Sequence, residues 1–282
     1  MITVEEALRR GVSQLSARPE LRETALQDAA LLLMHTLGVT RATLVAHPER
    51  RFTTEEQVAY QAMLQRRVVF EPLQYILGEQ EFYGLPLKVT PAVLIPRPET
   101  EHLVEAVLAR LPKDKPVRIA DIGTGSGAIA IALAHLLPLA EVAALDLSPA
   151  ALSIARENAI RHGVQDRIRF IESDLLAAVA GERFDAIVSN PPYIPSADRE
   201  TMHPQVTEFE PAGALFAEDD GLAVYQRLIP QAAQSLEPSG LLAMEFGFGQ
   251  RDAIAELLSG WDAVGFIDDL QGIPRVALAR WP

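Results

Sequence analysis

The sequence predicts an α/β protein in which helices cover both faces of a parallel sheet, with a small helical bundle preceding it. From residue 117 onward, short apolar runs rich in β-branched residues alternate with amphipathic stretches of helical length. This alternation is typical of parallel strands joined by crossover helices. Residues 1–80 show only the helical period. With 282 residues, 49% of them hydrophobic, the chain is long enough for both parts.

The first 80 residues are expected to form an N-terminal helical domain. Two Thr-x-x-Glu capping boxes, beginning at Thr3 and Thr53, mark helix starts, and Gly38 is a natural C-terminal cap. Packed together, these helices make a small bundle. The expected helices cover 3–15, 20–38 and 53–70, with a shorter one beginning at Pro72.

Residues 81–97 change character, because β-type residues there are punctuated by Gly84 and three prolines. This pattern predicts a β-hairpin that connects the two domains.

The remaining residues, 98–282, are expected to form the sheet domain. Its last two strands follow each other without a helix between them, which predicts a hairpin at one sheet edge. Helices are expected at 98–111, 126–137, 148–163 and 251–260, with one more between the fourth and fifth strands, and strands at 117–122, 141–147, 168–173, 184–189, 240–247, 263–269 and 275–281.

The charge is unevenly distributed, since residues 101–282 hold 14 Lys or Arg against 26 Asp or Glu within a net charge of −13. An acidic surface repels phosphate backbones, so no direct DNA binding is expected. The chain has no cysteine, which excludes disulfides and thiolate chemistry, and its six histidines lack metal-ligand spacing, so no metal site is predicted. Without a signal peptide or an apolar run of about 18 residues, it is expected to be soluble and cytoplasmic, with no membrane contact.

A glycine-rich stretch, DIGTGSGAIA at 121–130, occupies the first strand-to-helix turn of the sheet domain. Glycines let a ligand approach the backbone, and the helix beginning near its end directs free N–H groups at an anion. The pattern fits a nicotinamide or flavin nucleotide or S-adenosylmethionine, and the structural alternative is a tight turn. The predicted cofactor-binding residues here are Gly123, Thr124, Gly125, Ser126 and Gly127.

Two carboxylates follow the next two strands. Asp146 lies about twenty residues beyond the glycines, where a carboxylate accepts hydrogen bonds from ribose hydroxyls. Its alternative role is to cap the following helix, for which Ser148 is better placed. Asp174 follows the third strand, where an acceptor for an adenine amine is expected, and a capping role is its alternative as well.

The tetrapeptide NPPY, Asn190 to Tyr193, follows the fourth strand and should face the same crevice. The Asn190 side-chain oxygen and the Pro191 carbonyl can accept both hydrogens of a planar NH2 group, and the prolines hold these acceptors rigid. Tyr193 can stack on the planar face. Such a clamp aligns a weak nitrogen nucleophile with an electrophilic methyl on sulfonium, which favours S-adenosylmethionine over a hydride donor. The alternative is a simple proline turn.

Together with LIPRPETE at 94–101, EPAGALFAEDDGLAVY at 210–225 and DLQGIPRV at 269–276, these motifs resemble the PrmC/HemK family. Members of that family methylate the side-chain amide of the glutamine in the GGQ motif of class I peptide chain release factors. The resemblance implies a Rossmann-like class I S-adenosylmethionine-dependent methyltransferase sheet. It also implies that the partner is the GGQ domain of a class I release factor.

The resemblance also assigns residues. It gives the glycine loop and Asp146 to S-adenosylmethionine, and it gives the NPPY segment, including Pro192, to the substrate glutamine, with Asn190 also close to the cofactor. Some members have a tryptophan beside the adenine where this chain has Leu175, which can cover the ring by apolar contact. Arg97 and Glu99 are expected to line the cleft for the substrate, and the alternative for Glu99 is to cap the helix after Pro98.

Two other functions remain open at this point. An adenine amino-methyltransferase acting on DNA or RNA would meet the same planar NH2 group, although the acidic catalytic half and the lack of a basic stripe argue against it. A non-catalytic S-adenosylmethionine-binding regulator would have no use for the clamp. The helical domain, whose charges nearly balance, is expected to dock the protein substrate, and the protein is expected to be a monomer.

Overall fold

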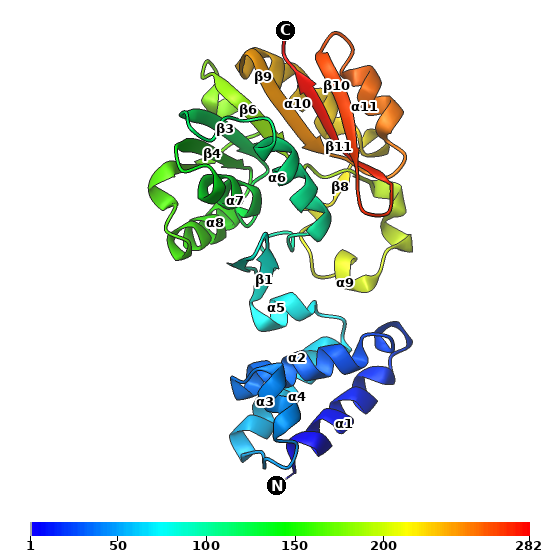
Figure 1. Ribbon diagram of the computed structural model, residues 1–282. Helices are drawn as coiled ribbons and strands as arrows, with labels where there is room; N and C mark the ends of the chain where they lie inside the picture. Colours follow the sequence, from blue (N-terminus) through cyan, green and yellow to red (C-terminus); the bar gives the residue numbers. More distant parts are fainter. Residues whose placement is uncertain (1) are drawn as a thin grey trace. The chain divides into compact units, whose positions relative to one another are not determined.

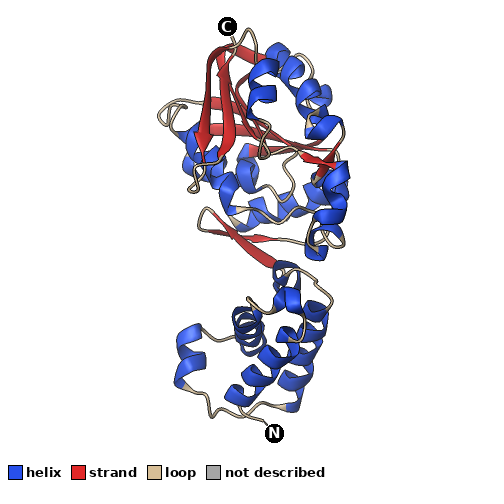
Figure 2. Ribbon diagram, turned by 90° about the vertical axis from the view of Figure 1, so that its right-hand side faces the viewer, coloured by secondary structure: helices blue, strands red, loops and turns tan. Residues whose placement is uncertain are grey.

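A computed structural model describes residues 2–282, and the chain divides into two compact units. The helical unit consists of Met1–Gly78 together with His203–Phe209, and the sheet unit consists of Glu79–Met202 and Glu210–Pro282. Figure 2 shows the difference in content, because the long strands all belong to the sheet unit. Residues 203–209 are distant in sequence from the first 78 residues and nevertheless cluster with them.

The helical unit packs around buried leucines and Phe52. At α4, Thr53 and Glu56 form the complete predicted capping box, although Glu56 also pairs with Arg50. At α1 only half of the box forms, and the Glu6 side chain pairs with Arg10. The expected helix 20–38 is interrupted before Ala25, and α3 was not predicted. The elements are α1 Val4–Ser16, η1 Pro19–Leu21, α2 Ala25–Leu37, α3 Arg41–Ala46, α4 Thr54–Val68, α5 Leu73–Leu77 and α9 Pro204–Thr207.

A buried ion pair holds this unit together. The Nε of Arg67 donates to the Asp28 carboxylate over 2.7 Å, and the two side chains are only 6% and 8% exposed. Thr24 donates to the same carboxylate, and a second nitrogen of Arg67 donates to Gln205 over 2.8 Å. The α9 segment is therefore attached to the unit by a polar contact as well as by the edge-on contact of His203 with Phe70.

The sheet unit begins with an antiparallel hairpin, β1 Glu79–Phe82 and β2 Leu85–Lys88, and then forms a seven-stranded sheet (Figure 1). The strand order is β10-β11-β9-β6-β3-β4-β5. Five strands are parallel, and β11 runs antiparallel to both β9 and β10, which confirms the predicted hairpin at the sheet edge. The strands are β3 Val117–Ile122, β4 Ala140–Asp146, β5 Ile168–Glu172, β6 Phe184–Ser189, β9 Leu236–Glu245, β10 Asp262–Asp268 and β11 Pro274–Arg280.

Helices cover both faces of the sheet, as predicted. Alternate residues of β3 show this, because Ile119 packs into one core cluster with α6 and α7, and Ile122 packs into another with α10 and α11. The elements are η2 Pro98–Thr100, α6 Glu101–Leu108, α7 Ala128–Leu136, α8 Pro149–Arg161, η3 Gln165–Arg167, η4 Ala177–Val179, α10 Ala223–Ser235 and α11 Arg251–Leu257. Within residues 2–282, no helix is long and apolar enough to cross a membrane.

The stretch between Asn190 and Gly221 contains short elements that no hydrophobic period in the sequence predicted. Two-residue strands, β7 Ile194–Pro195 and β8 Phe216–Ala217, pair in parallel with each other. The remaining turns are η5 Ser196–Thr201, η6 Ala212–Ala214 and η7 Asp219–Gly221. Both strands belong to the sheet unit, and their pairing joins the residues that follow the NPPY segment to the segment that begins at 210.

Candidate active site

The glycine loop, Asp146 and the NPPY segment meet because of the strand order. In β3, Ile122 pairs with Leu145 of β4 on one side and with Ser189 of β6 on the other. The three strands therefore end side by side, at the point where the order of the sheet reverses. In open α/β sheets this edge is the usual place for a ligand.

The glycine loop has a backbone that favours glycine. Gly123, Gly125 and Gly127 have φ values of 72°, 56° and 83°, in the left-handed region. A Cβ atom on either of the first two would meet no atom nearer than 4.0 Å, so the space above the backbone is open to a ligand. On Gly127 it would lie 2.9 Å from Cδ1 of Ile131 and 3.1 Å from Cβ of Ala155, so the third glycine is needed for packing.

Asp121, at the start of this motif, was not singled out from the sequence. Its side chain is fully buried, and Oδ2 accepts hydrogen bonds from the Thr124 hydroxyl (2.7 Å) and the Ala130 N–H (3.1 Å). Its Oδ1 has no partner within residues 2–282. Burial raises the pKa of Asp121 to about 7, in spite of the two hydrogen bonds. Asp121 does not line the cavity described below, so its bonds to Thr124 and Ala130 hold the loop from beneath.

Asp146 ends β4 with its carboxylate held by two backbone groups. Oδ2 accepts from the Gly125 N–H and Oδ1 from the Ser148 N–H, each over 2.8 Å. Ser148, rather than Asp146, caps α8 through the N–H of Ala151. The carboxylate is thus fixed at the cavity with lone pairs remaining for a ligand.

A cavity of about 290 Å³ lies over these turns, entirely within the sheet unit. Apolar side chains line much of it, among them Leu94 and Leu147, the latter 71% exposed. The predicted site residues that line it are Gly123, Gly125, Asp146, Asp174, Leu175, Asn190 and Pro192. The others do not line it, namely Thr124, Ser126, Gly127, Pro191, Tyr193, Arg97 and Glu99.

Asp174 and Leu175 both belong to this lining. Asp174 forms an ion pair with Arg227 over 2.5 Å, and both side chains are about half exposed. The Ser173 hydroxyl accepts the N–H of Ala178, so Ser173 caps this turn and Asp174 does not. Leu175 has a φ of 52°, an unusual backbone conformation for a leucine, and it also packs against the core cluster on that face of the sheet.

A buried chain of hydrogen bonds supports the NPPY segment. The Asn190 side-chain amide (Nδ2) donates to the Thr100 hydroxyl over 2.9 Å, and Thr100 Oγ1 donates to Glu245 Oε2 over 2.6 Å. The Tyr193 hydroxyl donates to the other oxygen of Glu245 over 3.2 Å. Burial raises the pKa of Glu245 above its ordinary value, whereas the bonds from Thr100 and Tyr193 and the charge of Arg275 lower it.

Neither Thr100 nor Glu245 was identified from the sequence. The signal for Glu245 was present, since it is a carboxylate at the end of an otherwise apolar strand, in GLLAMEF. Thr100 gave no such signal, because nothing in LIPRPETE separates it from a helix-start residue.

Tyr193 is held from several sides. Its hydroxyl reaches Glu245, and its carbonyl accepts from the Gln250 side chain over 3.0 Å. A Cβ atom on Gly221 would lie 2.1 Å from that carbonyl oxygen, and one on Gly247 would lie 3.0 Å from Cδ2 of the ring. Tyr193 is therefore fixed in one position, with its ring half-buried.

Arg97 and Glu99 lie in the LIPRPETE segment but outside the cavity lining. Arg97 pairs with the buried carboxylate of Glu210 over 2.6 Å, and Glu210 also accepts the N–H of Ile95. This pair joins LIPRPETE to the segment that begins at 210. Glu99 is exposed, and neither η2 nor α6 has a side-chain cap, so the capping alternative for Glu99 is not formed.

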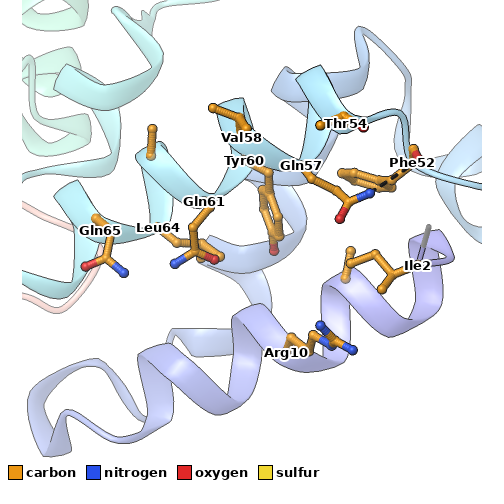
Figure 3. Close-up of a pocket in the computed structure, with 12 residues that line it drawn as sticks. Ile2, Arg10, Phe52, Thr54, Gln57, Val58, Tyr60, Gln61, Leu64 and Gln65 are labelled. Atoms are coloured by element: carbon orange, nitrogen blue, oxygen red, sulfur yellow. Dashed lines mark hydrogen bonds between the residues drawn. The ribbon is translucent and has the colours of Figure 1, made fainter.

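A larger groove, of about 490 Å³, lies in the helical unit between α1 and α4. Figure 3 shows Tyr60 and Gln57 of α4 directed towards α1, with Arg10 on the opposite side. None of the predicted site residues lines this groove, and Arg10 is already paired with Glu6. The candidate active site is therefore the smaller cavity at the sheet edge.

Comparison with known proteins gives matches across both units. Residues 6–78 match the family model described as PrmC N-terminal domain, and residues 100–209 match the one described as methyltransferase small domain. A solved methyltransferase structure from Pyrococcus furiosus is 16% identical, with a TM-score of 0.53 over 78% of this chain and 96% of that one, which shows a shared fold.

Two curated relatives are much closer in sequence. A release factor glutamine methyltransferase from Koribacter versatilis is 46% identical over 90% of this chain and 91% of that protein. One from Escherichia coli is 42% identical over 97% of each chain. On these identities and this coverage, the chain belongs to the release factor glutamine methyltransferase family.

Proposed function

We propose that this enzyme transfers a methyl group from S-adenosylmethionine to the side-chain amide nitrogen of the glutamine in the GGQ motif of class I peptide chain release factors. The observation that carries the proposal is the clamp after β6. Asn190 donates through Nδ2 to Thr100, so its Oδ1 is left without a partner among residues 2–282 at a cavity that the side chain lines. The names of the curated relatives support the same substrate.

The cavity residues fit the methyl donor. The open backbone at Gly123 and Gly125 accommodates an anionic end. Asp146 is assigned to the ribose, with Asp174 and the apolar Leu175 assigned to the adenine side. When bound, S-adenosylmethionine supplies an electrophilic methyl group on sulfonium.

The chain's own residues then act on the acceptor amide. Asn190 Oδ1 and the carbonyl of Pro191 accept its two hydrogens, and the two prolines keep these acceptors rigid. These two hydrogen bonds increase the electron density on the amide nitrogen, which is otherwise a weak nucleophile. They also fix the direction from which it attacks. The clamp needs no strong base, because the nitrogen carries a positive charge once it has accepted the methyl group and then loses one proton readily to water or to the acceptors that hold it.

We assign docking of the release factor to the helical domain at residues 1–80, with 81–97 as connector and 98–282 as the methyltransferase domain. The match of residues 6–78 to the PrmC N-terminal model supports this assignment. Arg97 and Glu99 are assigned to the substrate side. A cytoplasmic monomer that does not bind DNA fits the negative charge of residues 101–282 and a substrate that belongs to translation.

A comparison of two substrates, each supplied separately, tests the proposal. The protein is incubated with S-adenosylmethionine and either a class I release factor or an adenine-containing DNA or RNA strand, and S-adenosylhomocysteine is measured. We expect turnover with the release factor only. Turnover with the nucleic acid alone would support an adenine methyltransferase instead, and no turnover with either would favour a non-catalytic regulator.

A further inference from the structure

Glu245 is a carboxylate that is only 2% exposed, at the end of an apolar strand and behind the acceptor clamp. Burying a carboxylate is costly unless it is fully hydrogen-bonded. Nothing in the proposed transfer requires a negative charge there, since the clamp needs only neutral acceptors. The arrangement of the hydrogen bonds around Glu245 indicates what the charge does.

An ionised carboxylate can only accept hydrogen bonds, and this fixes the direction of the whole chain. Thr100 has one hydroxyl hydrogen, and it is given to Glu245 over 2.6 Å. Thr100 can then only accept from Asn190, which must present its Nδ2 group. The Oδ1 of Asn190 is consequently left for the cavity.

We propose that Glu245, acting through Thr100, is a positioning residue that sets the orientation of the Asn190 side-chain amide, so that an acceptor rather than a donor meets the substrate. The inference rests on the proposed function only in that the substrate offers an NH2 group. With a donor at position 245, the chain reverses: Thr100 accepts from residue 245 and donates to the Asn190 oxygen. Asn190 then presents its own NH2 to the NH2 of the substrate, and the clamp is lost.

The charged and titratable groups that face Glu245 are consistent with this role. Tyr193 donates to its carboxylate, and the Tyr225 hydroxyl on α10 donates to its backbone carbonyl over 2.8 Å. Arg275 on β11 favours the ionised form, and Glu99 on η2 opposes it. Because burial raises the pKa of Glu245, the acid limb of the rate profile should lie at a higher pH than an exposed glutamate would give.

The substitutions Glu245→Gln and Thr100→Val test the chain, because each keeps the side-chain shape. We expect Thr100→Val to lower kcat by about 10²-fold, the usual scale for one preorganised hydrogen-bonding group, with little change in KM or in cofactor affinity. Glu245→Gln should lower kcat less, because the glutamine oxygen can still accept from Thr100 while its NH2 group faces Tyr193. Thr100→Ser keeps the hydroxyl and should restore most of the rate. Ser235→Ala, which removes a buried hydroxyl from the end of α10 outside the cavity lining, is the control and should leave kcat unchanged.

The melting temperature distinguishes a positioning role of Glu245 from a purely structural one. A raised pKa means that the ionised form of Glu245 opposes folding at neutral pH, since the stabilisation present at low pH is lost as the pH rises through the raised value. Glu245→Gln should therefore melt at the same temperature as the parent or higher, while its acid limb disappears. A parallel loss of melting temperature and rate, with the acid limb intact, would overturn the proposal.

A direct reading does not depend on methyl transfer at all. In the parent and in Thr100→Ser, nuclear magnetic resonance should show that one Asn190 side-chain N–H exchanges slowly with solvent, with the signal assigned by its loss in Asn190→Asp. In Thr100→Val it should exchange fast. Equal, fast exchange of both N–H groups in the parent would refute the proposed orientation. A release factor that fails to accept methyl would refute the proposed function and leave this reading intact.

Discussion

Substitution of Asp146 tests the cofactor site, because each carboxylate oxygen already has a known backbone partner. Oδ2 accepts from Gly125 and Oδ1 from Ser148, both at 2.8 Å, and the remaining lone pairs face the cavity. Asp146→Ala removes both acceptors. A hydrogen bond to a charged group contributes about 1.5–3 kcal/mol, so the loss of two corresponds to about 3–6 kcal/mol of binding free energy.

This loss corresponds to a dissociation constant for S-adenosylmethionine that is raised by about 10²- to 10⁴-fold. Asp146→Asn keeps one oxygen, so it should lose about one bond and about 10- to 10²-fold in affinity. Isothermal titration calorimetry measures both. The control is Ser148→Ala, which removes the cap of α8, costs about 1 kcal/mol of unfolding free energy and leaves cofactor affinity within about threefold. An Asp146→Ala variant that binds within about threefold of the parent would refute the assignment of Asp146 to the ribose.

Three further substitutions address the clamp, the buried acid and the glycine loop. Asn190→Ala should retain cofactor binding and lower kcat by at least about 10²-fold in single-turnover assays, and an unchanged rate would contradict the clamp. Asp121 has its pKa raised to about 7 by burial, so its stabilisation of the folded state, about 4 kcal/mol in all, is present at low pH and lost as the pH rises through 7. The melting temperature of the ligand-free protein should accordingly fall between pH 5 and pH 8, and Asp121→Asn should flatten that dependence, whereas an equal slope in both proteins would exclude Asp121 as its source. Gly127→Ala places a Cβ atom 2.9 Å from Ile131 at a φ of 83°, and it should lower the free energy of unfolding by about 1–3 kcal/mol in a denaturant titration. An unchanged free energy of unfolding would mean that the loop adjusts freely and that Gly127 is not needed for packing.

The sequence was sufficient for the parts of the fold that repeat a period or end on a special residue. Gly38 ends α2 at a φ of 63°, and Thr53 begins α4 with a full capping box, because both signals act within a few residues. At Thr3 the same signal formed only in part: the Glu6 side chain pairs with Arg10, whereas Glu56 pairs with Arg50 and still completes its box. Which of these arrangements forms depends on side-chain placement, which a spacing rule does not contain.

The site residues also fall into those that the sequence could predict and those that it could not. The glycine loop, Asp146 and Asn190 could be brought together from the sequence because parallel strands end at one edge of the sheet. The Thr100–Glu245 chain could not, since it joins residues 145 positions apart through strand order and side-chain direction. The ion pair of Arg97 with Glu210 could not be predicted either, because it depends on how a segment without periodicity folds back.

The central claim is that the clamp after β6 presents the glutamine amide of a GGQ motif to the methyl donor. The most direct measurement is mass analysis of the GGQ peptide from a class I release factor incubated with the protein and S-adenosylmethionine, with fragmentation that locates the added group. The account predicts one methyl group on the side-chain nitrogen of that glutamine, and none when Asn190→Ala replaces the parent. An unmodified glutamine, or a methyl group on another residue of the peptide, would contradict it.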